Sequence, residues 1–373
     1  MSSPQRQPAT RLEALLRARQ FVITAEITPP VSCDADDLLR KAQPLSGLAD
    51  AVNVTDGASA RAHLCAPIAA ALLARAGIEP ILQFTCRDRN RIALQADLMG
   101  AAACGVHNLL CLTGDDPKAG DQPQAKAVFD VDSTTLTAMA RKVRDKGELP
   151  SGRKVAGRAR FFLGAADAPV DPPAGWQPDK LAAKVAAGAE FAQTQFCMDL
   201  GVVRRYAACV AEHAATRGVF LLIGIAPLRS AKSARWMQQR LYGAIIPDSL
   251  IERLEQAADP AAEGERIAVE LIEQLAAIPG VAGVHVMAPA NEDAVPRVIA
   301  EARQRLTRRE PALPAVPRGW KPAGPSASRD STQLFAKGRI AGAGNDGRGA
   351  PPKLTLADLG VIDLGSHRLA DLG

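Results

Sequence analysis

The chain has 373 residues, enough for one large α/β domain with a tail or a second small unit. Its formal net charge of +5 is mild and its basic residues are spread along the chain, which argues against nucleic acid as the main partner but suits a small anionic substrate. Aromatic residues make up only 4% of the chain, so no stacking platform for single-stranded nucleic acid is evident.

The seven cysteines are scattered, odd in number and free of any C-x-x-C spacing, a pattern typical of reduced cytosolic thiols. The five histidines are isolated, so no metal site is predicted. The polar, arginine-containing residues 1–18 do not resemble a secretory signal. No apolar run approaches the roughly 20 residues needed to cross a bilayer. We therefore expect a cytoplasmic protein without membrane or metal partners.

Short apolar runs recur along the chain, and each is followed by a segment with helical periodicity. Eight runs predict strands, at residues 21–28, 51–55, 80–85, 108–113, 160–165, 191–197, 219–225 and 284–288. The other segments predict helices, at residues 36–45, 60–76, 91–103, 133–146, 178–187, 201–216, 233–241, 261–277 and 295–306. This alternation indicates right-handed βαβ units, and their number favours a closed (β/α)8 TIM barrel.

A doubly wound sheet is the alternative, but no G-x-G-x-x-G motif follows the first strand and no G-x-x-x-x-G-K-[ST] motif occurs. We expect an N-terminal helix or arm at residues 1–19 and the barrel at residues 20–309. Residues 310–373 are rich in Pro, Gly, Ala and Ser, a composition that buries little apolar surface. They predict an extended or partly disordered tail, which either docks on the barrel or a partner or stays disordered.

Glu26 lies in the first predicted strand, which is otherwise β-branched and apolar. An ionised carboxylate is costly to bury unless it is paired or its pKa rises. Two interpretations follow: a structural glutamate satisfied by an arginine or by backbone amides, or a proton donor that faces a pocket.

In a (β/α)8 barrel the active site lies at the carboxyl ends of the strands. Six predicted strands carry polar residues there, and such convergence is the usual picture of a ligand site. These residues are Glu26, Asn53, Thr55, Asp56, Gln83, Arg87, Thr113, Asp115, Asp167, Gln193 and Gln195. No Ser/His/Asp or Cys/His arrangement suggests a nucleophile. A buried acid, a second acid and amide side chains suit proton transfer to a ring nitrogen, assisted by an organic cofactor.

Several short motifs occur in a fixed order over roughly residues 20–307. They are TAEITPP from Thr24, VNVTDG from Val52, LTGDDP from Leu112, KVAAGA from Lys184, QTQF from Gln193 and GVHV from Gly283. Jointly they resemble the methylenetetrahydrofolate reductase family, in a branch with longer chains. The resemblance implies reduction of 5,10-methylenetetrahydrofolate to 5-methyltetrahydrofolate by NAD(P)H, through a bound flavin, FAD, in a ping-pong scheme.

The resemblance also implies roles for individual residues. Glu26 would protonate N10 of the folate, Asp115 would favour the resulting cationic iminium, and Gln195 would hydrogen-bond the pterin or the nicotinamide. The other positions expected to bind substrate are Gln193, Ser233 and Met237. The positions expected to bind the flavin are Thr55, Gln83, Arg87, Thr113, Gly114, Ala165, Asp167 and Lys184.

The chain departs from the family pattern at several of these positions. Asp167 and Asp171 replace a Tyr and a His beside the flavin, and two acids near a pyrophosphate disfavour it electrostatically. The other departures are Lys180, Ala183, Ser233, Met237 and Asn291. The arginines at 87, 89 and 91 would either supply the missing positive charge or form a solvated loop.

Two alternatives to the flavin-dependent reductase therefore stay open. The first keeps the reaction without tightly bound FAD, by direct hydride transfer or with FMN. The second is a non-catalytic barrel that binds folate or a partner. The choice between NADH and NADPH and the presence of a homo-oligomer are also open.

Overall fold

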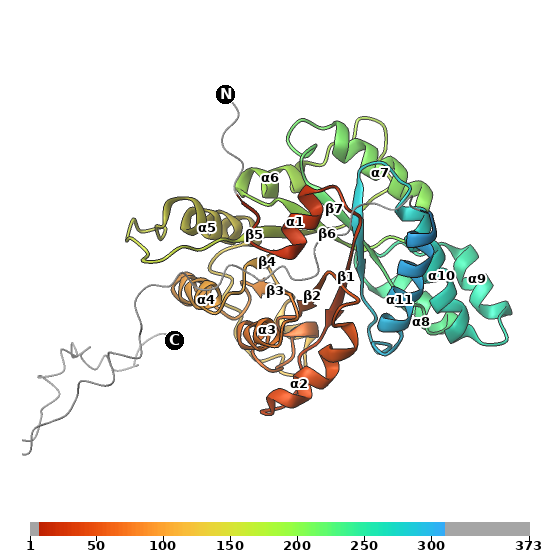
Figure 1. Ribbon diagram of the computed structural model, residues 1–373, viewed down its shortest axis with the longest axis horizontal. Coiled ribbons are helices and arrows are strands. Elements are labelled where there is room, and N and C mark those ends of the chain that lie inside the picture. The colour runs from red at the N-terminus through yellow and green to blue at the C-terminus, as the bar shows by residue number, and fades with distance from the viewer. Residues whose placement is uncertain (1–6, 310–373) are drawn as a thin grey trace, which may run out of the picture. The chain divides into compact units, whose positions relative to one another are not determined.

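The computed structural model describes residues 7–309, and the tail predicted for residues 310–373 lies outside this range. In the described part eight parallel strands form a closed barrel in chain order, with β8 paired to β1 (Figure 1). The strands are β1 Val22–Ile27, β2 Ala51–Val54, β3 Pro80–Thr85, β4 Asn108–Leu112, β5 Phe162–Asp167, β6 Phe191–Phe196, β7 Phe220–Ile225 and β8 Val281–Val286. The predicted (β/α)8 TIM barrel is confirmed.

Each predicted strand overlaps an observed one, and the differences lie at the ends. The largest is in β8, which begins at Val281 rather than at residue 284. Val281 pairs with Leu221 of β7, and Gly283 pairs with Val22 of β1. Partners on both sides hold these small residues in the sheet, so tertiary context overrides a weak local strand propensity.

Helices cover the outside of the barrel (Figure 1). They are α1 Arg11–Arg17, α2 Ala35–Ala42, α3 Ala66–Arg75, α4 Arg91–Ala103, α5 Ser133–Lys146, α6 Asp179–Ala187, α7 Leu200–Glu212, α8 Ala231–Arg240, α9 Asp248–Gln256, α10 Pro260–Leu275 and α11 Ala294–Arg309. Short 3₁₀ helices are η1 Gln43–Leu45, η2 Ala58–Ala60 and η3 Pro117–Ala119. No helix within residues 7–309 is long and apolar enough to cross a membrane.

The helices α4 and α5 have the predicted bounds because their ends carry local signals. Asn90 Oδ1 accepts the backbone N–H groups of Ile92 and Ala93, both at 3.1 Å, and Asp132 caps α5 in the same way. Gly147 ends α5 with a φ of 60°, a left-handed conformation that glycine adopts readily.

Helix α9 is an addition to the predicted helices. Its N-cap is Pro247, which makes no side-chain cap hydrogen bond. Ile251 and Leu254 of α9 are buried in the main core. Packing of this apolar face stabilises α9, and the sequence also carries local signals for it, Asp248 in the first turn and Arg253 in the last.

The interior of the barrel is apolar at its amino-terminal end, where α1 lies across it (Figure 1). Three leucines of α1 pack against the first residues of several strands. The buried cluster includes Leu12, Leu15, Leu16, Val22, Ala51, Phe162, Phe191 and Phe220. Because α1 covers this end, a ligand that enters the barrel interior does so from the carboxyl ends of the strands.

Candidate active site

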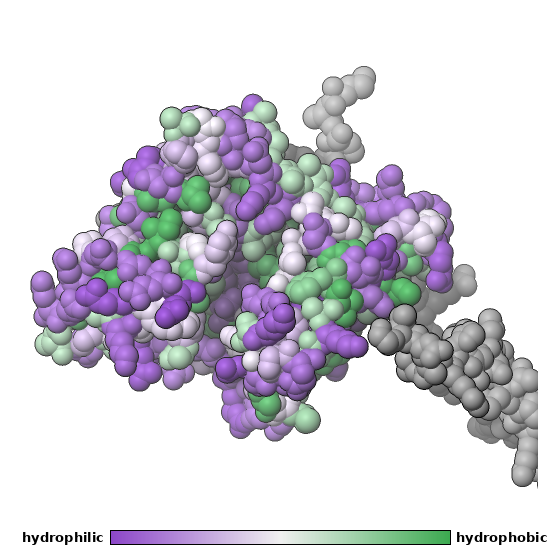
Figure 2. Space-filling view, turned by 180° about the vertical axis from the view of Figure 1, so that it is seen from behind, coloured by the Kyte–Doolittle hydropathy of each residue, from purple (hydrophilic) through white to green (hydrophobic). Residues whose placement is uncertain are grey.

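The inner wall of the barrel changes from apolar to polar towards the carboxyl ends of the strands. Four buried polar residues follow the apolar cluster along the strands: Thr24, Asn53, Gln193 and His285. Glu26 lies two residues after Thr24 on β1. On the side of the molecule turned away in Figure 1, the surface is hollowed near its centre and is bordered by many hydrophilic side chains (Figure 2).

Glu26 lies on β1, between β2 and β8, and its side chain is 21% exposed. Gln83 of β3 donates from Nε2 to Glu26 Oε2 at 2.6 Å. His285 of β8 places its Nε2 at 3.6 Å from the same oxygen. No arginine contacts Glu26 within the described residues, so its partners are an amide and an imidazole. This environment differs from the arginine or backbone pairing expected of a purely structural glutamate.

A hydrogen-bonded layer lies directly beneath Glu26. Asn53 Nδ2 donates to Gln193 Oε1 at 2.6 Å, and Gln193 Nε2 donates back to Asn53 Oδ1 at 3.0 Å. Gln193 Nε2 also lies 3.2 Å from Thr24 Oγ1, which is 3.0 Å from His285 Nδ1. All four side chains are at most 3% exposed. Gln193 is therefore part of the barrel interior, and its burial argues against the substrate contact expected for it.

The end of β2 presents a buried hydroxyl. Thr55 is 5% exposed, and its Oγ1 has no hydrogen-bond partner within residues 7–309. A buried polar atom without a partner is costly, and where it persists it often serves a ligand. Thr55 is thus the strongest structural indication of a bound group near Glu26.

In the loop after β3, Arg87 and Arg89 form hydrogen bonds and ion pairs with other residues of the protein. Arg87 is 4% exposed, pairs with Asp88 and donates to the carbonyl oxygen of Gly57 at 3.1 Å. The hydrogen bond with Asp88 is the main cause that raises the pKa of Arg87, and the charge of Asp115 contributes less. Arg89 forms a double hydrogen bond with Asp56 at 2.6 and 3.1 Å. The interpretation of these arginines as a solvated loop is wrong for Arg87 and Arg89, because both are engaged within the protein.

The end of β4 is more open. Thr113 and Asp115 are exposed, and Thr113 Oγ1 accepts the backbone N–H of Ser133 at 3.3 Å. Gly114 has a φ of +94°, and a Cβ there would lie 3.0 Å from Arg87 Cβ and 3.2 Å from Thr85 Cβ. Gly114 is thus needed for close packing of the loops after β3 and β4.

Asp167 at the end of β5 and Asp171 beyond it both have partners on α7. The hydroxyl of Tyr206 donates to Asp167, and Arg205 forms two hydrogen bonds with Asp171, at 2.6 and 2.9 Å. Burial and then the charge of Asp167 raise the pKa of Tyr206, so the phenol stays protonated. Lys184 of α6 donates to the carbonyl oxygen of Ala166 at 2.6 Å.

The remaining predicted site residues differ in how far their side chains are buried. Ala165 is fully buried, and this burial argues against the flavin contact expected for it. Gln195 is partly buried and its Oε1 accepts the N–H of Phe196 at 3.0 Å. Ser233 donates to the carbonyl oxygen of Ser230 at 2.8 Å within the capping box of α8. Met237 is 7% exposed and belongs to the main core. This burial argues against the expected contact between Met237 and substrate.

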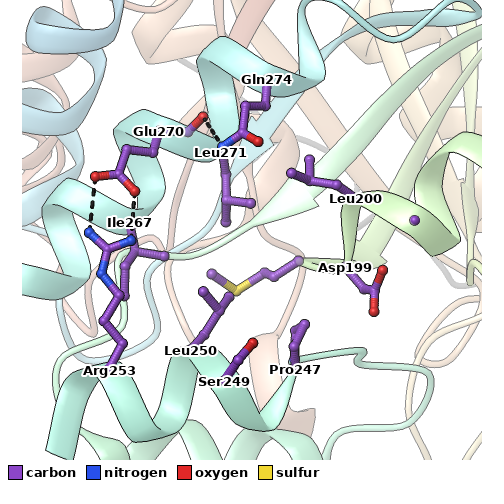
Figure 3. A pocket seen from close by; sticks show the side chains of 12 residues that line it. Asp199, Leu200, Pro247, Ser249, Leu250, Arg253, Ile267, Glu270, Leu271 and Gln274 are labelled. Carbon is purple, nitrogen blue, oxygen red and sulfur yellow. Dashed lines mark hydrogen bonds and ion pairs between the residues drawn. The ribbon is translucent and has the colours of Figure 1, made fainter. Parts of the chain in front are cut away.

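A pocket of about 330 Å³ lies elsewhere, between the start of α7, α9 and α10 (Figure 3). Two of its charged groups pair with each other, Arg253 with Glu270 at 2.6 and 2.9 Å. None of the predicted site residues lines it. A smaller cavity of about 180 Å³ reaches Glu26 from the side of α2 and the segment before α11.

The structure thus brings Glu26 and Gln83 together and adds His285, which the sequence analysis did not single out for a role. The sequence does contain an indication of a role for His285, because a histidine is unusual at a position of an apolar strand that faces the barrel interior. Its proximity to Glu26 depends on β8 closing against β1, where Thr24 and His285 pair in register.

These features define the class of protein: a (β/α)8 barrel with a carboxylic acid and amides at the carboxyl end of its interior. Residues 11–303 match the family model described as methylenetetrahydrofolate reductase, and the chain belongs to that family.

Two comparisons add to this. Methylenetetrahydrofolate reductase 2 of Schizosaccharomyces pombe is 28% identical over 202 residues, which is 52% of this chain and 30% of that protein. The matched part thus spans less than a third of this curated relative. An uncharacterized protein from Clostridium thermocellum, whose structure binds two copies of 5-methyl-5,6,7,8-tetrahydrofolic acid, has a TM-score of 0.52 and 14% identity. The match covers 80% of this chain and 99% of that one, and at this identity it supports the fold.

Proposed function

We propose that this protein reduces 5,10-methylenetetrahydrofolate to 5-methyltetrahydrofolate, with NAD(P)H as the reductant and FAD as the hydride carrier. Membership of the family supports the reaction class. The observation that carries the proposal is Glu26, held inside the carboxyl end of the barrel by Gln83 at 2.6 Å.

The role of Glu26 follows from the chemistry of the substrate. The imidazolidine ring of the folate opens when N10 takes a proton, because the bond from N10 to the methylene carbon then breaks and leaves an iminium at N5. A hydride added to the methylene carbon completes the reduction, and NAD(P)H is oxidised to NAD(P)⁺. Glu26 would give the proton to N10 as a general acid. Asp115, exposed at the end of β4, would favour the cationic iminium, and Gln195 would hydrogen-bond the pterin.

The residues around Glu26 fit a flavin. When bound, this cofactor would pass the hydride of NAD(P)H to the folate. The unpartnered hydroxyl of Thr55 and the amide of Gln83 would bind its polar ring atoms. Asp167 and Asp171 are less unfavourable to a pyrophosphate than their charges suggest, because Tyr206 and Arg205 bind them. Lys184 would supply a cation on the same side, and Thr113 and Gly114 would contribute at the end of β4.

A second candidate keeps the reaction and omits tightly bound FAD. It is favoured by Asp167, because its partner Tyr206 is a neutral donor and brings no positive charge to the place expected for a pyrophosphate. In this case the hydride would pass directly from NAD(P)H, or FMN would take the place of FAD. A flavin absorbance band in the purified protein separates the two candidates.

The test of the function is the folate-dependent oxidation of NAD(P)H by the full chain, with and without Glu26→Gln. We expect turnover by the unaltered protein and a loss of about 100-fold or more in the variant, since general acid catalysis contributes about that much. Reduction of the flavin by NAD(P)H should be almost unchanged. Glu212→Gln, on the exposed surface of α7, is the matched control.

Two results would contradict the proposal. Absence of folate-dependent oxidation in the unaltered protein would leave a non-catalytic barrel as the alternative. Equal loss of both half-reactions in Glu26→Gln would refute a proton transfer confined to the folate step.

A further inference from the structure

Strand β6 contains an irregularity around Gln195. Gln193 of β6 pairs with Leu222 of β7, and Phe196 pairs with Gly224. Between these two pairs β6 advances by three residues and β7 by two, so β6 contains one extra residue at or beside Gln195. An extra residue of this kind is a β-bulge, and bulges beside active sites often change the direction of a side chain. The bulge therefore bears on how Gln195 meets a substrate.

The hydroxyl of Thr194 connects the two strands at the bulge. Its Oγ1 accepts the backbone N–H of Gly224 at 2.9 Å and donates to the carbonyl oxygen of Gln195 at 2.8 Å. Thr194 is 3% exposed, so water has little access to either bond. A side-chain oxygen thus takes the place of a carbonyl acceptor for Gly224, and it is tied to the backbone of the residue that follows it.

Strand β7 is adapted to the bulge at Gly224. A Cβ at this position would lie 2.3 Å from the carbonyl oxygen of Thr194 and 2.8 Å from that of Gln195. Glycine within a strand often marks a bulge or a place where another backbone approaches closely. The bulge is therefore built by residues of both strands.

The side chain of Gln195 is bound to the bulge as well. Its Oε1 accepts the backbone N–H of Phe196 at 3.0 Å. Because a backbone N–H group only donates, the oxygen of the amide is occupied and its NH₂ group is the part left for a ligand. Within residues 7–309 this NH₂ group makes no hydrogen bond. The backbone of the bulge thus holds the amide of Gln195 in one orientation.

We propose that Thr194 is a positioning residue for Gln195. The hydroxyl of Thr194 holds the bulge, and the bulge holds the amide of Gln195 at the carboxyl end of β6 with its NH₂ group available to the substrate. The effect on the substrate rests on the proposed function, whereas the hydrogen bonds of Thr194 do not.

Amide hydrogen exchange tests the bulge without any enzymatic activity. Thr194→Val keeps the shape of the side chain and removes the hydroxyl, so the N–H of Gly224 loses its acceptor. We expect this N–H to exchange about three- to tenfold faster in the variant, the effect of one hydrogen bond, in NMR of the ¹⁵N-labelled full chain. Unchanged exchange at Gly224 would overturn the proposal.

Thr216→Val is the matched control for this measurement. Thr216 is also buried, and its Oγ1 donates to the carbonyl oxygen of Val210 at 2.7 Å, so the variant loses a comparable hydrogen bond outside the barrel wall. Exchange at Gly224 should stay unchanged in Thr216→Val. An equal acceleration in both variants would indicate general destabilisation and would also overturn the proposal.

The effect on the substrate is measured as KM for 5,10-methylenetetrahydrofolate. We expect KM to rise about three- to tenfold in Thr194→Val, as for the loss of one hydrogen bond, and kcat to change less. Thr194→Ser keeps the hydroxyl and should recover most of the loss. Equal losses in Thr194→Val and Thr194→Ser would refute a role of the hydroxyl.

A double-mutant cycle decides whether Thr194 acts through Gln195. Gln195→Ala removes the amide, so adding Thr194→Val to it should not raise KM further. A further rise in KM would show that Thr194 acts in another way and would overturn the proposal. Inactivity of the unaltered protein would refute the proposed function instead, and hydrogen exchange would still decide whether Thr194 holds the bulge.

Discussion

The hydroxyl groups of Thr55 and Thr85 lie close to the same end of the barrel but have different surroundings. Thr85 Oγ1 donates to Asp56 Oδ2 at 2.8 Å, whereas Thr55 Oγ1 has no partner within the described residues. Removing an unpaired buried hydroxyl costs nothing in hydrogen bonding, while removing one bound to a carboxylate leaves an acceptor unsatisfied. The hydrogen bond of Thr85 therefore indicates a role in stability, whereas the unpartnered hydroxyl of Thr55 indicates a role in ligand binding.

Thr55→Val is therefore expected to leave the free energy of unfolding unchanged or to raise it by up to about 1 kcal/mol. The same change should weaken flavin binding, measured by titration of the apoprotein. Thr85→Val is the matched control and should lower the free energy of unfolding by about 1.5–3 kcal/mol. A clear destabilisation by Thr55→Val would show that the hydroxyl has a structural partner.

At the scale of the elements, close contacts within the barrel depend on glycine at defined strand positions. A Cβ on Gly164 of β5 would lie 2.2 Å from the ring of Phe191 on the adjacent strand β6. That ring is stacked on Phe162 at 4.9 Å between centroids. The small residue at 164 thus makes room for the aromatic cluster that fills the amino-terminal end of the barrel.

We expect Gly164→Ala to lower the free energy of unfolding by about 1–3 kcal/mol, the usual cost of overpacking a core. Gly100 in α4 is the matched control, because a Cβ there would meet nothing within 4 Å. Gly100→Ala should stabilise the protein by about 0.5–1 kcal/mol through the better helix propensity of alanine. Urea denaturation of both variants checks this, and equal effects would contradict the packing argument.

At the scale of the whole molecule, folding leaves three cysteines exposed, buries three others and leaves Cys209 partly buried. Cys33, Cys65 and Cys104 are exposed. Burial raises the pKa of Cys86 to about 11 and the pKa values of Cys111 and Cys197 to about 12. The thiolate is the reactive form, so the buried thiols are protected both by access and by protonation.

At pH 8 a thiol reagent should label the three exposed cysteines rapidly and the three buried ones only after denaturant is added. Peptide mapping by mass spectrometry identifies the sites. Fast labelling of Cys111 in the folded protein would contradict the arrangement of the core. Replacing the exposed cysteines by serine provides the control, since most of the rapid reaction should disappear.

The same pKa values imply a loss of stability in alkali. Unfolded thiols ionise near pH 8.5, whereas the buried ones ionise at about 11 to 12 in the folded protein. Their contribution to stability is complete below the unfolded pKa and is lost as the pH rises towards the folded pKa. Denaturation curves at pH 8 and pH 10 should show the lower stability at pH 10.

The sequence by itself was sufficient for the barrel, because strand and helix periods, caps and the order of βαβ units are local signals. It also placed Glu26 at the carboxyl end of β1, since alternation along a strand determines which side chains share a face. Weakly patterned segments, such as the start of β8, needed their neighbours in the sheet.

Only the tertiary structure decided what surrounds Glu26. The amides of Asn53 and Gln193 meet across 140 positions of sequence, which withdraws Gln193 from the surface. Met237 lies in the core, and His285 reaches Glu26 because the barrel closes between β8 and β1. Side-chain hydrogen bonds between distant strands depend on which residues the closed sheet brings face to face, and the sequence of one strand does not identify those partners.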